Sequence, residues 1–177
     1  MYLKSLKGCR LAIGLYPYFH YDASGGGGKA EVSPTEKENI QYLKFSHKTF
    51  SIPPITRKTT TFLNLRLPPG LKIEMCMDSL EGTVDHGSGN VSLDFESRFI
   101  FTIGSLFQFP DLFVKTCLKT SKVKSKYYEE EGLVLQEDGK AKLVGVAIIP
   151  VTGNNFLDRF LNLPNEALAV LKCELTQ

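Results

Sequence analysis

Residues 91–103 read VSLDFESRFIFTI, and the alternation in this stretch predicts the fold. The odd-numbered side chains are apolar apart from Ser97, and the even-numbered ones are polar or charged apart from Ile100. A period of two is typical of a strand with one face buried and the other in water. At about 3.3 Å per residue the strand would be roughly 40 Å long. The sequence therefore predicts long antiparallel β-structure with an aromatic interior.

The neighbouring sequence extends this pattern in both directions. The alternation that starts at Leu71 changes phase after Ser79, which predicts a β-bulge at Asp78–Ser79. The glycine-rich residues 86–90 then predict a hairpin turn. We expect further strands at these positions: 9–21 (bent at Pro17), 40–51, 59–67, 112–119, 142–149 and 167–175. The predicted fold class is all-β, a long antiparallel meander forming a barrel or strongly curved sheet with little helix; a β-sandwich is the alternative.

Composition limits the class of protein. A chain of 177 residues favours one domain spanning 1–177. The 21 Lys and Arg against 19 Asp and Glu give no basic excess of the kind that nucleic-acid binding requires. The apolar runs are a few residues long, so we expect no transmembrane segment.

A run of four glycines, Gly25–Gly28, dominates a polar region. It predicts a mobile glycine-rich loop at about 22–39. Gly28-Lys29 resembles the end of a phosphate-binding loop, but Ala30 stands where that motif needs a hydroxyl. We therefore predict no nucleotide and no other cofactor.

No catalytic or metal motif is visible. The four cysteines are far apart in sequence, which predicts reduced thiols and no metal knuckle. His20, His47 and His86 have no metal-binding spacing. We therefore assign no catalytic residue and no metal ligand.

The aromatic side chains provide the candidate site. Phe95, Phe99 and Phe101 share a strand face, which Ile73 and Met75 of the preceding strand would join. These five residues line an apolar cavity or fill a core, and a filled core is the commoner arrangement in small barrels. Phe107 and Phe109 would lie at the mouth of the cavity or at a tip that touches a membrane.

A basic stretch follows in the next strand and beyond it. Its members are lysines at alternating or nearly alternating positions: Lys115, Lys119, Lys122, Lys124 and Lys126. Acidic residues 129–131 come after it. Such runs usually form a solvated face, and docking on an anionic membrane is the alternative.

Two stretches resemble an uncharacterised plant family of nuclear-encoded plastid proteins. They are residues 14–27, GLYPYFHYDASGGG, and residues 143–164, which include LVGVA and FLDRFLNLP. The resemblance implies a chloroplast protein and no known activity. This chain shows no transit peptide, so a cytoplasmic protein or an N-terminally truncated product is the alternative expectation.

Three functional hypotheses follow. The first is a non-catalytic chloroplast protein that binds an apolar ligand, a lipid or a thylakoid-associated partner. The second is a protein-interaction or assembly factor with a filled core, whose working surface is a strand edge or the segment containing Tyr16, Tyr18, His20 and Tyr21. The third is a small isomerase or cyclase that uses His20 or Tyr21 with a carboxylate across the sheet.

Overall fold

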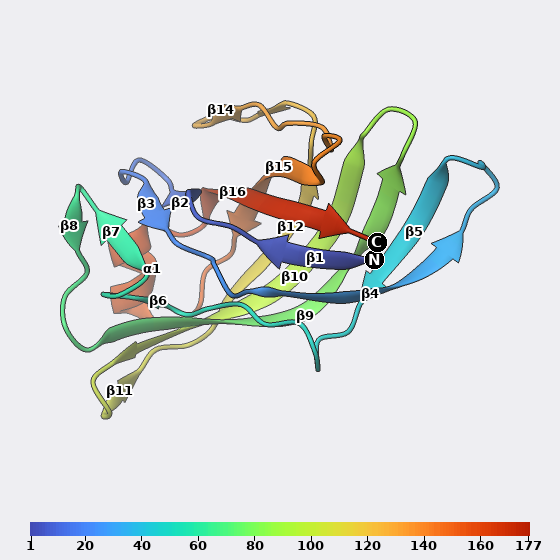
Figure 1. Ribbon diagram of the computed structural model, residues 1–177. Helices are drawn as coiled ribbons and strands as arrows, with labels where there is room; N and C mark the ends of the chain where they lie inside the picture. The colour runs from blue at the N-terminus through green and yellow to red at the C-terminus, as the bar shows by residue number, and fades with distance from the viewer.

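The computed structural model describes residues 1–177, which form strands and one short helix (Figure 1). Strand accounts for 56% of the chain and helix for 4%, so the all-β prediction is confirmed. The elements in chain order are β1 (Tyr2–Ser5), β2 (Cys9–Ile13), β3 (Phe19–Tyr21), β4 (Gly27–Pro34), β5 (Ile40–Phe45), β6 (Ile55–Thr56), β7 (Thr60–Phe62), β8 (Leu65–Arg66), β9 (Leu71–Asp85), β10 (Val91–Ile103), β11 (Phe107–Gln108), β12 (Leu112–Lys119), β13 (Val123–Lys124), β14 (Glu129–Glu130), β15 (Lys140–Ile149), α1 (Asn155–Leu161) and β16 (Asn165–Thr176).

The antiparallel pairings return to the first strand. The order runs β1-β4-β5-β9-β10-β12-β15-β16, and β16 pairs again with β1 from Tyr2 opposite Thr176 to Ser5 opposite Cys173. The eight strands therefore ring round a common interior (Figure 1). This agrees with the prediction of a strongly curved antiparallel sheet.

Alternate residues of these strands fill the ring. Leu3, Leu43, Leu93 and Leu143, from β1, β5, β10 and β15, are each completely buried in one cluster. Each strand thus presents one face to the core, as the period of two in the sequence requires.

The β9–β10 hairpin contains the predicted bulge. Glu96 lies opposite Ser79 and Ser97 lies opposite Met77, so Asp78 is the extra residue of β9. The Asp78 carboxylate accepts hydrogen bonds from Nε of Arg98 at 3.0 Å and from Nη2 at 2.9 Å. The bulge therefore turns a carboxylate toward a guanidinium on the neighbouring strand.

Two predicted strands are hairpins instead. Residues 9–21 form β2 and β3, because the chain reverses after Gly14, whose φ is +53°. Residues 59–67 contain β7 and β8, because Leu63 and Asn64 both have positive φ angles and form a tight turn. These strands continue the sheet from β16 in the order β2-β3-β7-β8.

The loop prediction at about 22–39 was wrong for Gly27–Pro34, which form β4 between β1 and β5. A side chain at Gly27 would place its Cβ 1.9 Å from the carbonyl oxygen of Leu3. At Gly28 the Cβ would lie 2.9 Å from the Phe50 ring. Glycine is needed at these positions because the neighbouring chain passes too close for a side chain. In a sequence, glycines kept for close packing look the same as the glycines of a flexible loop.

The outer face of β15 is covered as well as the inner one. Val123 and Tyr128, from the β13–β14 hairpin, pack on Val144 and Val170, and the Tyr128 hydroxyl donates to the Gly14 carbonyl at 2.8 Å. At the other end of β15 the helix α1 packs on the sheet through buried Leu157 and Leu161.

Candidate functional site

The five predicted lining residues come together on β9 and β10, where Ile73 lies opposite Phe101 and Met75 opposite Phe99. Phe95 packs against the core of the ring. The other four pack around a second cluster that includes Tyr21, Ile55 and Leu67. All five therefore contact neighbouring apolar side chains of this chain.

The interior polar groups are engaged with the backbone. The Ser97 hydroxyl donates to the carbonyl of Cys76 at 2.9 Å, and the Thr116 hydroxyl donates to that of Val146 at 2.8 Å. Every buried side-chain nitrogen and oxygen has a hydrogen-bond partner. A ligand site normally contains a few convergent polar groups that orient the ligand, and here such groups already bond to the protein.

The predicted interaction segment is divided between two environments. Tyr21 is buried, its hydroxyl donates to the Pro53 carbonyl, and burial raises its pKa. The Tyr18 ring lies 5.0 Å from the guanidinium carbon of Arg10. His20 is exposed, and neither His20 nor Tyr21 bonds to a carboxylate. The acid–base pair of the third hypothesis is thus not assembled.

Tyr16 belongs instead to a row of four aromatic rings, which we call the aromatic row. Phe109 stacks on Phe156 with ring centroids 5.9 Å apart, and Phe156 stacks on Phe160 at 6.0 Å. Phe160 contacts Tyr16 at 5.8 Å, and the Tyr16 hydroxyl donates to the Phe160 carbonyl. The row links the residues after β11, helix α1 and the β2–β3 turn.

Helix α1 exposes half of its apolar side chains. Leu157 and Leu161 are buried, whereas Phe156 and Phe160 are 65% and 56% exposed. The pairs Phe156/Phe160 and Leu157/Leu161 each have i,i+4 spacing and lie on adjoining sides of the helix. The sheet covers the leucine side, and the sequence pattern alone does not show which side that would be.

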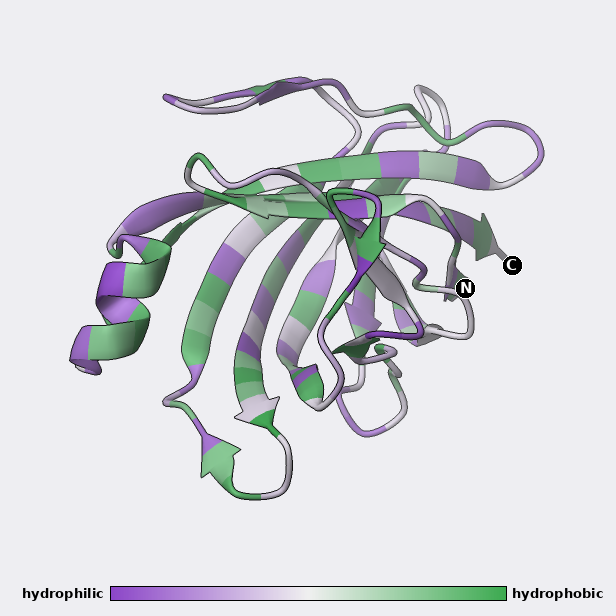
Figure 2. Cartoon of the chain, turned by 90° about the vertical axis from the view of Figure 1, so that its left-hand side faces the viewer, coloured by the Kyte–Doolittle hydropathy of each residue, from purple (hydrophilic) through white to green (hydrophobic).

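More large apolar side chains protrude from the turns at the same end of the molecule. We define the apolar end as the exposed residues of four segments: Leu15, Tyr16, Leu63, Leu65, Leu106, Phe107, Phe156 and Phe160. Figure 1 shows these segments on the side of β7, β8, β11 and α1, away from the two termini, and Figure 2 faces that side. Leu106 is 85% exposed and Phe107 is 67% exposed. Phe107 thus lies at a tip, and Phe109 lies against α1.

Unpaired cations accompany the apolar end. Arg57, Lys58, Arg66 and Arg159 have no carboxylate within ion-pair distance. The nearby Asp158 carboxylate is engaged, because it accepts from the hydroxyl and the N–H of Thr152, which lowers its pKa. The apolar end therefore carries a positive charge that this chain does not neutralise.

The lysine run at 115–126 has a different environment. Lys115 pairs with Glu96, and Lys122 and Lys124 both pair with Glu129. Three of the five lysines are therefore paired within the protein, as on an ordinary solvated face.

Comparisons with protein-family models, with curated proteins and with solved structures find no match to this chain. The structure contains no helix with the length and apolar character that crossing a bilayer would require.

Proposed function

We propose that this protein is a non-catalytic module that binds the surface of a lipid bilayer through the apolar end. The observation that carries the proposal is the gathering of eight exposed large apolar side chains, from four separate segments, beside four unpaired cations. Large exposed apolar patches mark sites of association with proteins or membranes.

The shape of the patch favours a bilayer as the occupant. Leu15, Leu63 and Leu106 each lie in a different turn and are between 62% and 85% exposed. Separate protruding tips suit a soft surface into which each can insert, whereas a partner protein fits best against a continuous, well-packed patch. Burying one Leu or Phe side chain fully is worth about 1.5–3 kcal/mol. Shallow insertion of several tips, together with attraction of cations to anionic lipid, supplies the two signals that stable membrane binding needs.

The packed interior weakens the case for a small apolar ligand held inside the strands. The second hypothesis, an interaction factor, expected a filled core. We propose the apolar end as the working surface, in place of a strand edge. We place the function at a chloroplast membrane because residues 14–27 and 143–164 resemble the plastid family.

The protein contains no tryptophan, which permits a direct test. Phe107→Trp introduces a single fluorophore at a tip of the apolar end. Tyr2→Trp introduces one at a half-exposed aromatic position on β1, near the termini. Each variant is mixed with vesicles of phosphatidylcholine alone, or of phosphatidylcholine with phosphatidylglycerol, and emission is recorded.

We expect the emission of Phe107→Trp to shift to shorter wavelength with the anionic vesicles and to be quenched by brominated acyl chains. Tyr2→Trp should show neither effect. If the tryptophan at position 107 stays in water while the protein is folded, the apolar end does not enter a bilayer and the proposal fails. Binding to vesicles with equal effects at both positions would also contradict it.

A further inference from the structure

A polar depression of about 320 Å³ lies next to the apolar end. It is lined by residues of β3, β7 and β8 and of the adjoining turns: Gly8, His20, Tyr21, Asp22, Arg57, Lys58, Thr59, Thr60, Thr61 and Arg66. We call it the cationic depression. Arg66 lies between exposed Leu65 and buried Leu67, so the depression starts one residue from the apolar end.

Strand register collects donors on one face of the sheet. His20 of β3 lies opposite Thr61 of β7, and Thr61 lies opposite Arg66 of β8. Side chains at paired positions point to the same face of a sheet, so the imidazole, the hydroxyl and the guanidinium form one row. The turn between β6 and β7 adds Arg57 and Lys58 at the edge of this row.

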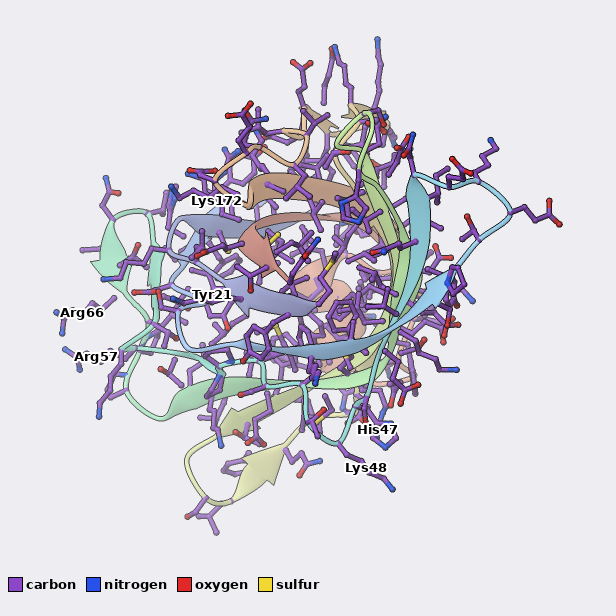
Figure 3. All side chains as sticks on the ribbon, turned by 45° about the vertical axis from the view of Figure 1, so that its right-hand side comes forward. Tyr21, His47, Lys48, Arg57, Arg66 and Lys172 are labelled. Carbon is purple, nitrogen blue, oxygen red and sulfur yellow. The ribbon has the colours of Figure 1, made fainter.

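These donors have no partners in the protein. The side chains of His20, Arg57, Thr61 and Arg66 make no hydrogen bond within the protein. The three cations of the depression, Arg57, Lys58 and Arg66, make no ion pair. Figure 3 shows Arg57 and Arg66 reaching away from the sheet at the same edge, to the left of Tyr21. An unpartnered group of guanidinium, ammonium and hydroxyl donors is the arrangement that binds oxyanions.

The one carboxylate in the depression is already engaged. Asp22 accepts from the backbone N–H of Ser24 at 3.0 Å and lies 3.8 Å from Nζ of Lys7. With three cations and one partly neutralised carboxylate, the depression retains an excess of positive charge. The excess matches a small dianion better than a neutral or cationic ligand.

We infer that the cationic depression binds a phosphomonoester, such as the exposed phosphate of an anionic lipid headgroup. This inference rests on the proposed function for its lipid source; the same chemistry would also take a free phosphate. The Arg57 and Arg66 guanidiniums each offer two parallel N–H groups to the phosphate oxygens, and Lys58 adds a point charge. A volume of about 320 Å³ is at the lower end for ligand pockets, which suits a single headgroup.

The test compares vesicles of equal surface charge. Phosphatidic acid supplies a monoester, and phosphatidylglycerol supplies a diester whose phosphate is flanked on both sides. The protein is the full chain, and the variant is Arg57→Gln with Arg66→Gln. The matched control is Lys37→Gln with Lys48→Gln, because both lysines are exposed, unpaired and outside the depression; Figure 3 shows Lys48 far from Arg57.

We expect the wild type and the control to bind phosphatidic acid more tightly than phosphatidylglycerol at matched charge. The arginine variant should lose this preference, with affinity for phosphatidic acid falling tenfold or more because two charged contacts are removed. In a second arm, inorganic phosphate is titrated into labelled protein. The amide signals of Gly8 and Thr61 should shift in the wild type and not in the arginine variant.

The outcomes separate this inference from the proposed function. Phosphate-dependent shifts without vesicle binding would support the depression as a site for free phosphate while the membrane proposal fails. Vesicle binding with no preference for phosphatidic acid and no phosphate-dependent shifts would overturn the inference and leave the membrane proposal standing. Folding of each variant is checked by its far-ultraviolet spectrum and its thermal midpoint.

Discussion

Gly27→Ala should destabilise this protein far more than Gly25→Ala in the same glycine run. Gly27 has a φ of +125° and lies where β4 pairs with β1, opposite Lys4. Its N–H donates to the Ser51 carbonyl at 2.8 Å, and its own carbonyl accepts from the Ser51 N–H at 2.9 Å. A Cβ at this position would lie 1.9 Å from the Leu3 carbonyl oxygen, so the two strands would have to separate.

The magnitude follows from those contacts. A non-glycine residue in a positive-φ conformation costs about 1–2 kcal/mol. Separating β4 from β1 weakens the two backbone hydrogen bonds on either side of this contact, from the Ser5 N–H to the Gly26 carbonyl at 3.0 Å and from the Ala30 N–H to the Met1 carbonyl at 2.9 Å, at about 1 kcal/mol each. The free energy of unfolding should therefore fall by about 3–4 kcal/mol. Gly25 is the matched control, because it has a φ of +89° but open space within 4 Å of its Cβ position. Gly25→Ala therefore carries only the cost of placing alanine at a positive φ.

Urea denaturation measures both variants. We expect a large decrease in the midpoint for Gly27→Ala, a small one for Gly25→Ala, and equal slopes, since the slope reports surface exposed on unfolding. In a protein of this size each kcal/mol corresponds to about 2–4 °C in the thermal midpoint. Equal effects of the two substitutions would show that residues 22–39 behave as the mobile loop that their composition suggests, and would refute the assignment of β4.

Three further outcomes are expected. Tyr128→Phe should lower the free energy of unfolding by about 1 kcal/mol, measured in urea, because one backbone carbonyl loses its donor. Burial raises the pKa of Cys173 to about 12, so at pH 8 a thiol reagent should modify half-buried Cys117 and leave Cys173 intact until denaturant is added. The Ser125 hydroxyl and two backbone N–H groups lower the pKa of Glu166. This contact therefore stabilises the fold above the ordinary carboxyl pKa and is lost as pH falls through the lowered value. Amide signals around Ser125 should change over that pH range, and Glu166→Gln should abolish the change.

Periodicity predicted the strands whose two faces differ. Residues 91–103 coincide with β10, and the phase change at Asp78–Ser79 located the bulge of β9. Both features follow from local alternation, because the core side of a strand is encoded by every second residue. Pairing between β1 and β16 could not be predicted this way, since it joins the two ends of the chain and nothing local specifies it.

Amino-acid composition gave the wrong local structure where a residue type is needed for close packing. Gly27 and Gly28 were interpreted as flexible because glycine is typical of loops, yet they allow neighbouring chain to pass close to β4. The aromatic side chains of α1 were missed for a related reason. In the sequence Phe156 and Leu157 look equally suited to a core, and only the position of the sheet decides that Leu157 is the buried one.

The distribution of aromatic side chains gives the strongest reason to look for function at the apolar end. The side chains with under 2% exposure are aliphatic or small, among them Leu93, Ile149 and Val170, and none is aromatic. Eight strands enclose a space that side chains just fill, and leucine and valine fill most of this one, with Phe45 the one aromatic residue buried in the cluster. The chain nevertheless contains 12 Phe and 7 Tyr. Packing inside the strands needs few of them, so stability of the core does not explain the exposed aromatic side chains Phe107 and Phe156. Exposed apolar side chains gathered at one end of a molecule are typical of an association surface.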